Sequence, residues 1–198
     1  MSKQAAQSTT NQITEGVIWK QLLIFFFPIL FGTFFQQLYN TADAIIVGNF
    51  VGKEALASVG GSASTIINLL VGFFVGLSSG ATVIISQYYG ADNRRRVRDS
   101  VHTAIALAIA GGVVIMLLGL VSARFALTAM GTPDDILSLS LTYMKIYYLG
   151  TIPSMIYNMG SGILRAVGDS KRPLYFLIAS CLVNIALDLL FVAVLGMG

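Results

Sequence analysis

The chain has 198 residues, of which 56% are hydrophobic and only 11% are charged. Soluble domains carry about 25% charged residues because their surface must be solvated, so this composition excludes a soluble protein. The net charge is +3, from 12 Lys and Arg against 9 Asp and Glu, and the one dense basic run lies between two apolar segments. That arrangement excludes a nucleic-acid-binding surface and indicates an integral membrane protein.

Five segments of the chain contain long stretches without Asp, Glu, Lys or Arg. A helix of about 20 residues, rising about 1.5 Å per residue, crosses a hydrocarbon core of about 30 Å. The runs are too long and too uniformly apolar for membrane β-strands, in which every second residue is apolar. The expected fold is an all-α polytopic membrane protein with about five transmembrane helices, at approximately residues 18–48, 54–87, 98–129, 136–164 and 172–196.

The distribution of Lys and Arg over the connections predicts the orientation. With the N-terminus inside, nine of these residues lie on the cytoplasmic side and three on the outer side. The three are Lys53, Arg124 and Lys145, near helix ends, where long basic side chains reach the interface. Residues 1–16 are polar, and the apolar run after them is too long for a signal peptide. We therefore expect a multi-pass protein of the cell membrane with residues 1–16 as a cytoplasmic tail.

Two carboxylates lie inside apolar sequence, Asp43 in the first expected helix and Asp188 in the fifth. Ionisable residues within membrane helices are costly and usually face the bundle interior or a wet cavity. Tyr39 precedes Asp43 by four residues, and Asn184 precedes Asp188 by the same spacing, so each acid has a polar neighbour one turn away on its own face. Both acids fall in the outer part of helices that run outward, so they are expected to line one cavity. The alternative is a purely structural role in capping or hydrogen bonding.

Other residues favour packing roles. Gly72, Gly76 and Gly80 repeat every fourth residue, a small-residue stripe that lets membrane helices approach closely. Pro28 removes one backbone hydrogen bond and is expected to bend the first helix. Cys181 is the only cysteine and cannot form an internal disulfide.

Three separated segments resemble one family in the right order. The first helix carries Pro28 and then Gln-Gln-Leu-Tyr-Asn-Thr-Ala-Asp at residues 36–43. The fourth connection reads Leu-Arg-Ala-Val-Gly-Asp-Ser-Lys-Arg-Pro at residues 164–173, and the pair Asn184 and Asp188 follows. From about Gly16 onward the chain resembles the N-terminal half of the multidrug and toxic compound extrusion (MATE) transporters. The details are similar to the branch of bacterial multidrug exporters and DNA-damage-inducible relatives.

The resemblance implies an architecture and an activity. MATE transporters usually have twelve helices in two six-helix lobes, so residues 17–198 would form most of the N-terminal lobe, without the sixth helix and the C-terminal lobe. The implied activity is antiport, in which entry of H⁺ or Na⁺ drives export of organic, often cationic, compounds. The implied partners are drugs, the lipid bilayer and the missing C-terminal lobe. No enzymatic activity and no cofactor beyond the coupling ion is expected.

The resemblance also assigns site residues. Asp43 and Asp188 match acids that line the cavity of the N-terminal lobe, and Tyr39 and Asn184 match their hydrogen-bonding partners. Asn158 in the fourth helix is a weaker match. Na⁺ prefers oxygen ligands, as hard cations do, and would be held at Asp43, Asn184 and Asp188.

Two other functions fit part of the pattern. Lipid-linked oligosaccharide flippases share the architecture but would need a more cationic cavity to hold phosphate. An intramembrane aspartyl protease would use two acids that share a proton. Its Gly-x-Gly-Asp pattern is not met, because the nearest run, Ala-Val-Gly-Asp at residues 166–169, has Ala in the first position and lies in a charged loop.

Overall fold

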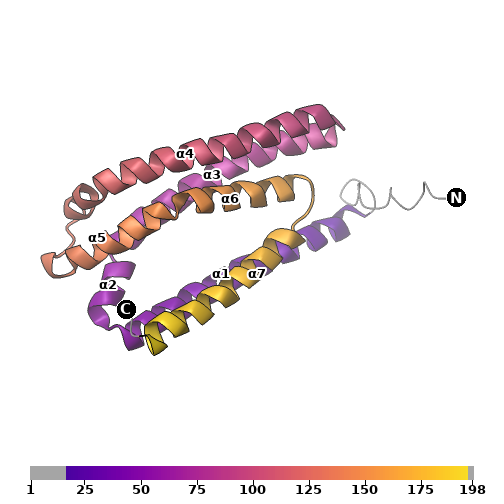
Figure 1. The fold of residues 1–198 in the computed structure, drawn as a ribbon. Helices are drawn as coiled ribbons and strands as arrows, with labels where there is room; N and C mark the ends of the chain where they lie inside the picture. The colour runs from indigo at the N-terminus through magenta and orange to yellow at the C-terminus, as the bar shows by residue number, and fades with distance from the viewer. Residues whose placement is uncertain (1–16, 196–198) are drawn as a thin grey trace.

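Helices make up nearly all of residues 17–195, the part of the chain that the computed structural model describes (Figure 1). Within these residues there is no β-strand, which confirms the all-α membrane fold. The expected tail at residues 1–16 and the end of the last expected helix, at residue 196, lie outside the described range. The elements are α1 (Ile18–Phe50), α2 (Lys53–Gly60), α3 (Ser62–Gly90), α4 (Arg94–Ala129), α5 (Asp134–Leu149), α6 (Thr151–Ala166), α7 (Lys171–Asp188) and a π-helical turn, η1 (Leu189–Val194).

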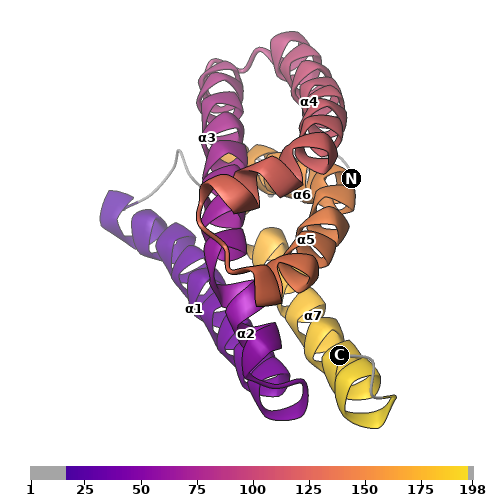
Figure 2. The ribbon, with the colours of Figure 1, turned by 90° about the vertical axis from the view of Figure 1, so that its left-hand side faces the viewer.

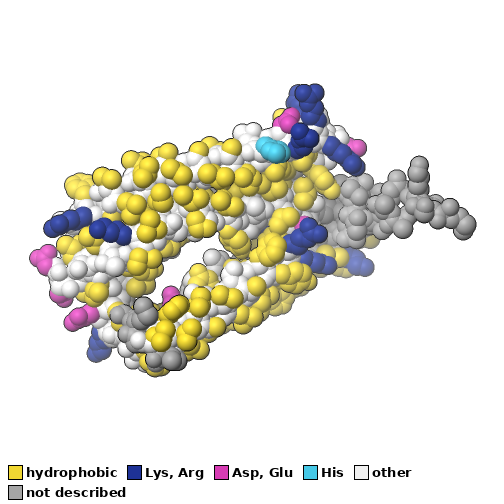
Figure 3. All heavy atoms as spheres, in the orientation of Figure 1, with side chains coloured by type: hydrophobic (Ala, Val, Ile, Leu, Met, Phe, Trp, Pro, Cys, Tyr) yellow, Lys and Arg dark blue, Asp and Glu magenta, His cyan; other side chains and the backbone are white. Residues whose placement is uncertain are grey.

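The surface between the two ends of the bundle is apolar, as a lipid-facing surface must be (Figure 3). Val121, for example, is 87% exposed. Four helical stretches are long and apolar enough to cross a membrane, namely Ile18–Phe50, Lys53–Gly90, Arg94–Ala129 and Lys171–Val192. The remaining span consists of α5 and α6 end to end. Each of these has 16 residues and so rises only about 24 Å.

Two of the expected helices are each divided in two, which corrects the prediction of single helices at 54–87 and 136–164. The second division follows from Pro153, which has no N–H to donate to the carbonyl of Leu149. The N–H of Gly150 still bonds to the carbonyls of the α5 residues Ile146 and Tyr147, at 3.2 and 3.0 Å, so α5 is closed at Gly150. The first division falls at Gly61, whose ψ of −132° is not helical. The helix α1, in contrast, continues through Pro28.

The helices form two layers (Figures 1 and 2). In one layer α3, α4, α5 and α6 pack together, and in the other α1 packs along α7. Both buried apolar clusters lie in the first layer, around Phe74, Met155 and Met159 and around Leu127 and Met144. The second layer is joined to the first mainly through α2, which contacts both α1 and α5, and through the connection from α6 to α7. The buried core thus holds α3, α4, α5 and α6 together, and the α1–α7 pair packs beside them without a core cluster of its own among the described residues.

Charged side chains gather at the two ends of the bundle (Figure 3). Residues 94–98, with four arginines, lie at the start of α4. The acidic pair Asp134 and Asp135 forms the first turn of α5, at the opposite end of α4. An apolar band bounded by two charged rims is the pattern of a bundle that crosses a bilayer.

Candidate functional site

A cavity of about 680 Å³ lies between the two layers, where Figure 3 shows a hollow. Five helices contribute to its wall, and the packed core of α3–α6 forms one side through Phe74. Many wall residues carry hydroxyl or amide groups. Polar groups inside a protein usually have hydrogen-bond partners, so a wall rich in them is typical of a cavity that holds solvent or a ligand. The polar wall residues are Thr33, Gln36 and Tyr39 of α1, Tyr147 of α5, Ser154, Tyr157, Asn158, Ser161 and Arg165 of α6, Ser170 before α7, and Ser180 and Asn184 of α7.

Three of the five predicted site residues lie on this wall, each on a different helix: Tyr39, Asn158 and Asn184. The acids Asp43 and Asp188 are not part of the wall but lie one helical turn beyond Tyr39 and Asn184. Their carboxyl groups are close enough to interact with each other. The structure therefore brings the two acids together from α1 and α7, at one end of the cavity rather than in its middle.

The α7 side of this pair carries acceptor atoms that are not satisfied. Among the described residues, the buried atoms Asn184 Oδ1 and Asp188 Oδ2 have no hydrogen-bond partner. Leaving a buried polar atom unpaired costs about 1–3 kcal/mol. Asp188 is also the last residue of α7, directly before the π-helical turn, and such turns are frequent at functional sites. Two orphaned oxygens one turn apart are chemically suited to a proton or a small cation.

Asn158 is held in place by a contact between the helices that form the opposite wall. Its backbone oxygen accepts a hydrogen bond from Ser78 Oγ of α3 at 2.7 Å, and its side-chain Nδ2 donates to the carbonyl of Ser154 at 2.9 Å. The close approach of α6 to α3 is possible because Gly162 has no side chain facing Ser78. The position of Asn158 on the wall is thus set by packing in the first layer.

The wall residues that sequence reasoning missed include Tyr147, Tyr157 and Arg165. Arg165 was assigned to the cytoplasmic connection, but it belongs to the last turn of α6 and contributes the only charged side chain among the described wall residues. Tyr143 and Tyr147 are four residues apart on α5. Both lie near Tyr39, and Tyr143 also lies near Asp43. The i, i+4 spacing of Tyr143 and Tyr147 was the feature of the sequence that could have identified this face of α5 as part of the site.

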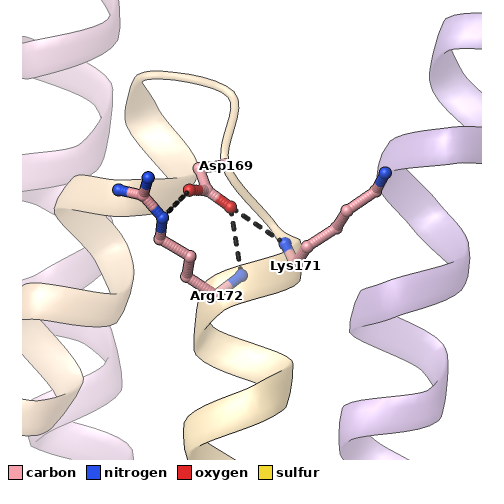
Figure 4. Close-up of polar contacts among 3 residues, drawn as sticks. All are labelled: Asp169, Lys171 and Arg172. Atoms are coloured by element: carbon pink, nitrogen blue, oxygen red, sulfur yellow. Dashed lines mark hydrogen bonds and ion pairs between the residues drawn. The ribbon is translucent and has the colours of Figure 1, made fainter.

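The start of α7 is fixed by the loop before it (Figure 4). Asp169 Oδ1 accepts hydrogen bonds from the backbone N–H groups of Lys171 and Arg172, at 3.2 and 3.0 Å. Asp169 Oδ2 also pairs with Arg172 Nε at 3.1 Å. Satisfying the first free N–H groups of a helix stabilises its N-terminus and defines where it begins. The loop therefore sets the register of α7 and, with it, the positions of Asn184 and Asp188.

No group of three His, Cys, Asp or Glu side chains that could hold a metal ion occurs among the described residues. A cation beside Asp43 and Asp188 would accordingly depend on amide, hydroxyl or backbone oxygens for its remaining ligands.

Comparisons with known proteins agree on one family. The MatE family model matches residues 28–190. Among curated relatives, the probable multidrug resistance proteins YoeA and YpnP of Bacillus subtilis are 32% and 31% identical, over 95% and 93% of this chain. The chain spans about 40% of the length of these relatives.

Solved structures give the same result. A MATE structure in complex with MaD3S superposes with a TM-score of 0.89 and 27% identity, covering 96% of this chain and 43% of that one. A transporter of the MOP superfamily from Pyrococcus furiosus, for which a reversed polarity of the binding pocket is described, also gives 0.89 and 27%, with 96% and 42% coverage. Because MATE proteins are transporters and not enzymes, the aspartyl protease alternative is excluded. The chain belongs to the MatE family and forms most of one lobe of a MATE transporter.

Proposed function

We propose that the protein to which this chain contributes a lobe is a secondary active exporter of organic, often cationic, compounds in exchange for H⁺ or Na⁺. The relatives named as probable multidrug resistance proteins support this activity. The cavity of about 680 Å³ also falls within the range of about 300–1,000 Å³ that suits drug-sized ligands. The observation that carries the proposal is the Asp43–Asp188 pair with its unsatisfied oxygens beside this cavity.

The acid pair is suited to binding a coupling ion. Two carboxylates side by side repel each other when both are ionised, and this repulsion is strong where water is scarce. A proton on one carboxyl group, or Na⁺ between the two, removes the repulsion and also satisfies Asp188 Oδ2. For Na⁺, Asn184 Oδ1 offers a further ligand one turn away. The pair therefore gains stability when either ion binds.

The cavity wall is suited to organic cations. Tyr39, Tyr147 and Tyr157 present aromatic rings from three different helices, and aromatic faces attract cations. Asn158 adds a hydrogen-bonding group. A cationic substrate in the cavity is drawn towards the same acids that hold the coupling ion, so the two compete. Such competition, combined with rocking of this lobe against the second lobe, gives exchange across the membrane.

We place the protein in the cell membrane with its N-terminus in the cytoplasm, because that orientation puts nine Lys and Arg residues inside and three outside. The end of the bundle with the arginines of residues 94–98 would then face the cytoplasm. The acid pair would lie towards the outer side.

The test uses the complete transporter in proteoliposomes, with a fluorescent organic cation as substrate and one imposed gradient at a time, of protons or of Na⁺. We expect Asp188→Asn and Asp43→Asn each to abolish gradient-driven transport, because the neutral amide neither binds a proton in this range nor repels its neighbour. Asp135→Asn is the matched control, since Asp135 is exposed in the first turn of α5 and far along the chain from both acids.

The outcomes separate the parts of the proposal. Loss of transport in both variants, with wild-type rates for Asp135→Asn, supports the acid pair as the coupling site. The gradient that drives wild-type transport identifies the ion. Full gradient-driven transport by Asp188→Asn would remove that residue from the mechanism.

A further inference from the structure

A second groove runs along the outer side of α3 and α4, away from the cavity between the layers. Its volume is about 590 Å³, and the described residues that line it all belong to these two helices. Most of its surface is apolar, and its polar residues gather at one end, where α3 leads into α4. The lining residues that matter here are Gly76 and Gly80 at the apolar end, and Tyr88, Arg96 and Asp99 at the polar end.

Two charged side chains line the polar end of the groove, Arg96 and Asp99, and three further arginines lie beside them in the first turns of α4, outside the lining. Residues 92–99 contain four arginines against the two acids Asp92 and Asp99. Within the described range, the arginine of this group that forms an ion pair is Arg94, with Asp92 at 3.8 Å. Arg96 instead lies over the ring of Tyr88, with its guanidinium carbon 5.4 Å from the ring centre. Stacking on a ring leaves the N–H groups at the guanidinium edge available to an anion.

The apolar end of the groove is open because glycines line it. A Cβ atom added at Gly76 or at Gly80 would meet nothing within 4 Å. The twelve steps along the helix from Gly76 to Tyr88 correspond to about 18 Å along its axis. This length is close to one leaflet of the hydrocarbon core, which is about 15 Å, half of about 30 Å. An apolar groove about as long as one leaflet is thick, with Arg96 at its polar end, suits one acyl chain and its anionic headgroup.

We propose that this groove binds one anionic phospholipid. Its phosphate lies at Arg96, at the level of the headgroups, and one acyl chain follows the groove over Gly80 and Gly76. Basic pockets between membrane helices recognise anionic headgroups in this way, and each nearby basic side chain contributes about 1 kcal/mol. Asp99 also lines the groove and offsets part of this attraction, while Arg94, Arg95 and Arg98 add positive charge next to the lining, at the same end of α4. The site is separate from the transport cavity, and the proposal does not depend on the transported compound.

The experiment is native mass spectrometry of the complete transporter in detergent, titrated with phosphatidylglycerol or with phosphatidylcholine of the same acyl chains. We expect one phosphatidylglycerol to bind with higher affinity than any phosphatidylcholine. Arg96→Ala should weaken this binding by about fivefold, the loss expected for one basic side chain. Gly80→Leu leaves the charge unchanged but fills the groove, so it should abolish the tight adduct.

Two matched controls keep the test specific. Arg172→Ala removes an arginine that is paired with Asp169 and lies outside the groove, and it should leave lipid binding unchanged. Gly72→Leu adds the same bulk on α3 one turn before Gly76. A Cβ at Gly72 also meets nothing within 4 Å, but Gly72 does not line the groove. It should also bind phosphatidylglycerol normally.

Three results would overturn the proposal. The first is equal binding of phosphatidylglycerol to wild type, Arg96→Ala and Gly80→Leu. The second is complete competition by inorganic phosphate at the same concentration as the lipid, which would mean that the apolar part of the groove contributes nothing. The third is an equal loss of thermal stability in Gly72→Leu and Gly80→Leu without a change in lipid binding, which would show that the glycines pack against protein.

Discussion

Replacing Gly162 by alanine is expected to destabilise the contact between α6 and α3. An added Cβ would come against Ser78 Oγ, and it would lie 2.7 Å from Thr82 Oγ1 and 3.2 Å from the backbone oxygen of Ser78. Neither hydroxyl can turn away freely, because Ser78 Oγ donates to the carbonyl of Asn158 at 2.7 Å and Thr82 Oγ1 donates to the carbonyl of Ser78 at 2.8 Å. Adding a methyl group to a packed interface costs typically about 1–3 kcal/mol.

Gly160→Ala is the matched control, since Gly160 lies on the same helix and a Cβ there meets nothing within 4 Å. Alanine is favoured over glycine in a helix by roughly 0.5–1 kcal/mol, and this gain is common to both variants. Their difference therefore isolates the packing cost of about 1–3 kcal/mol. The measurement is the melting temperature of the complete transporter in detergent, where Gly162→Ala should melt several degrees below Gly160→Ala. Equal melting temperatures would refute the close packing of α6 on α3.

Three further predictions concern the core, a helix start and the cavity. Phe74→Ala should destabilise the protein by about 3–5 kcal/mol because the Phe74 side chain is 1% exposed, whereas Phe73→Ala should cost far less because Phe73 is 56% exposed. Unfolding in denaturant compares the two variants, and similar costs would contradict the core assignment. Asp169→Ala should destabilise the start of α7 by about 1 kcal/mol, seen as a lower melting temperature, and an unchanged value would argue against the cap. Cys181 is buried against α1 and should react slowly with a maleimide, whereas Ser180→Cys in a Cys181→Ser background should react quickly because position 180 is exposed. Equal rates would indicate that α1 and α7 separate.

The number of membrane segments and the closeness of the two acids were predictable from the sequence, whereas the expectation that both acids line the cavity was wrong, since they lie one turn beyond its wall. Charge-free stretches mark the spans because ionised side chains are excluded from hydrocarbon, and this constraint acts on each segment independently of the rest. The meeting of Asp43 and Asp188 followed from their similar depth on helices that run in the same direction. Such predictions need only the sequence and the thickness of the membrane.

The divisions of the second and fourth spans into two helices each were not predicted, because their causes are local. Hydropathy is unchanged across Gly150, so an average over a window does not detect the break there. Across Gly61 it rises from α2 to α3, but no charged residue marks the break. Pro153 was the signal for the second, because a proline removes the hydrogen bond to the residue four positions earlier. The place of Arg165 on the cavity wall was not predictable, because it depends on how far α6 extends before the turn at Gly168.

The four arginines of residues 94–98 oppose any change in the orientation of the bundle after it has been inserted into the membrane. Turning the bundle over would carry these four side chains through the hydrocarbon, at a cost of about 2.5–3.5 kcal/mol each on insertion scales and therefore about 10 kcal/mol or more in total. Each factor of ten in rate corresponds to about 1.4 kcal/mol, so spontaneous inversion would be slowed by about seven orders of magnitude relative to an uncharged bundle. The direction in which the chain is threaded during synthesis is therefore kept until the protein is degraded.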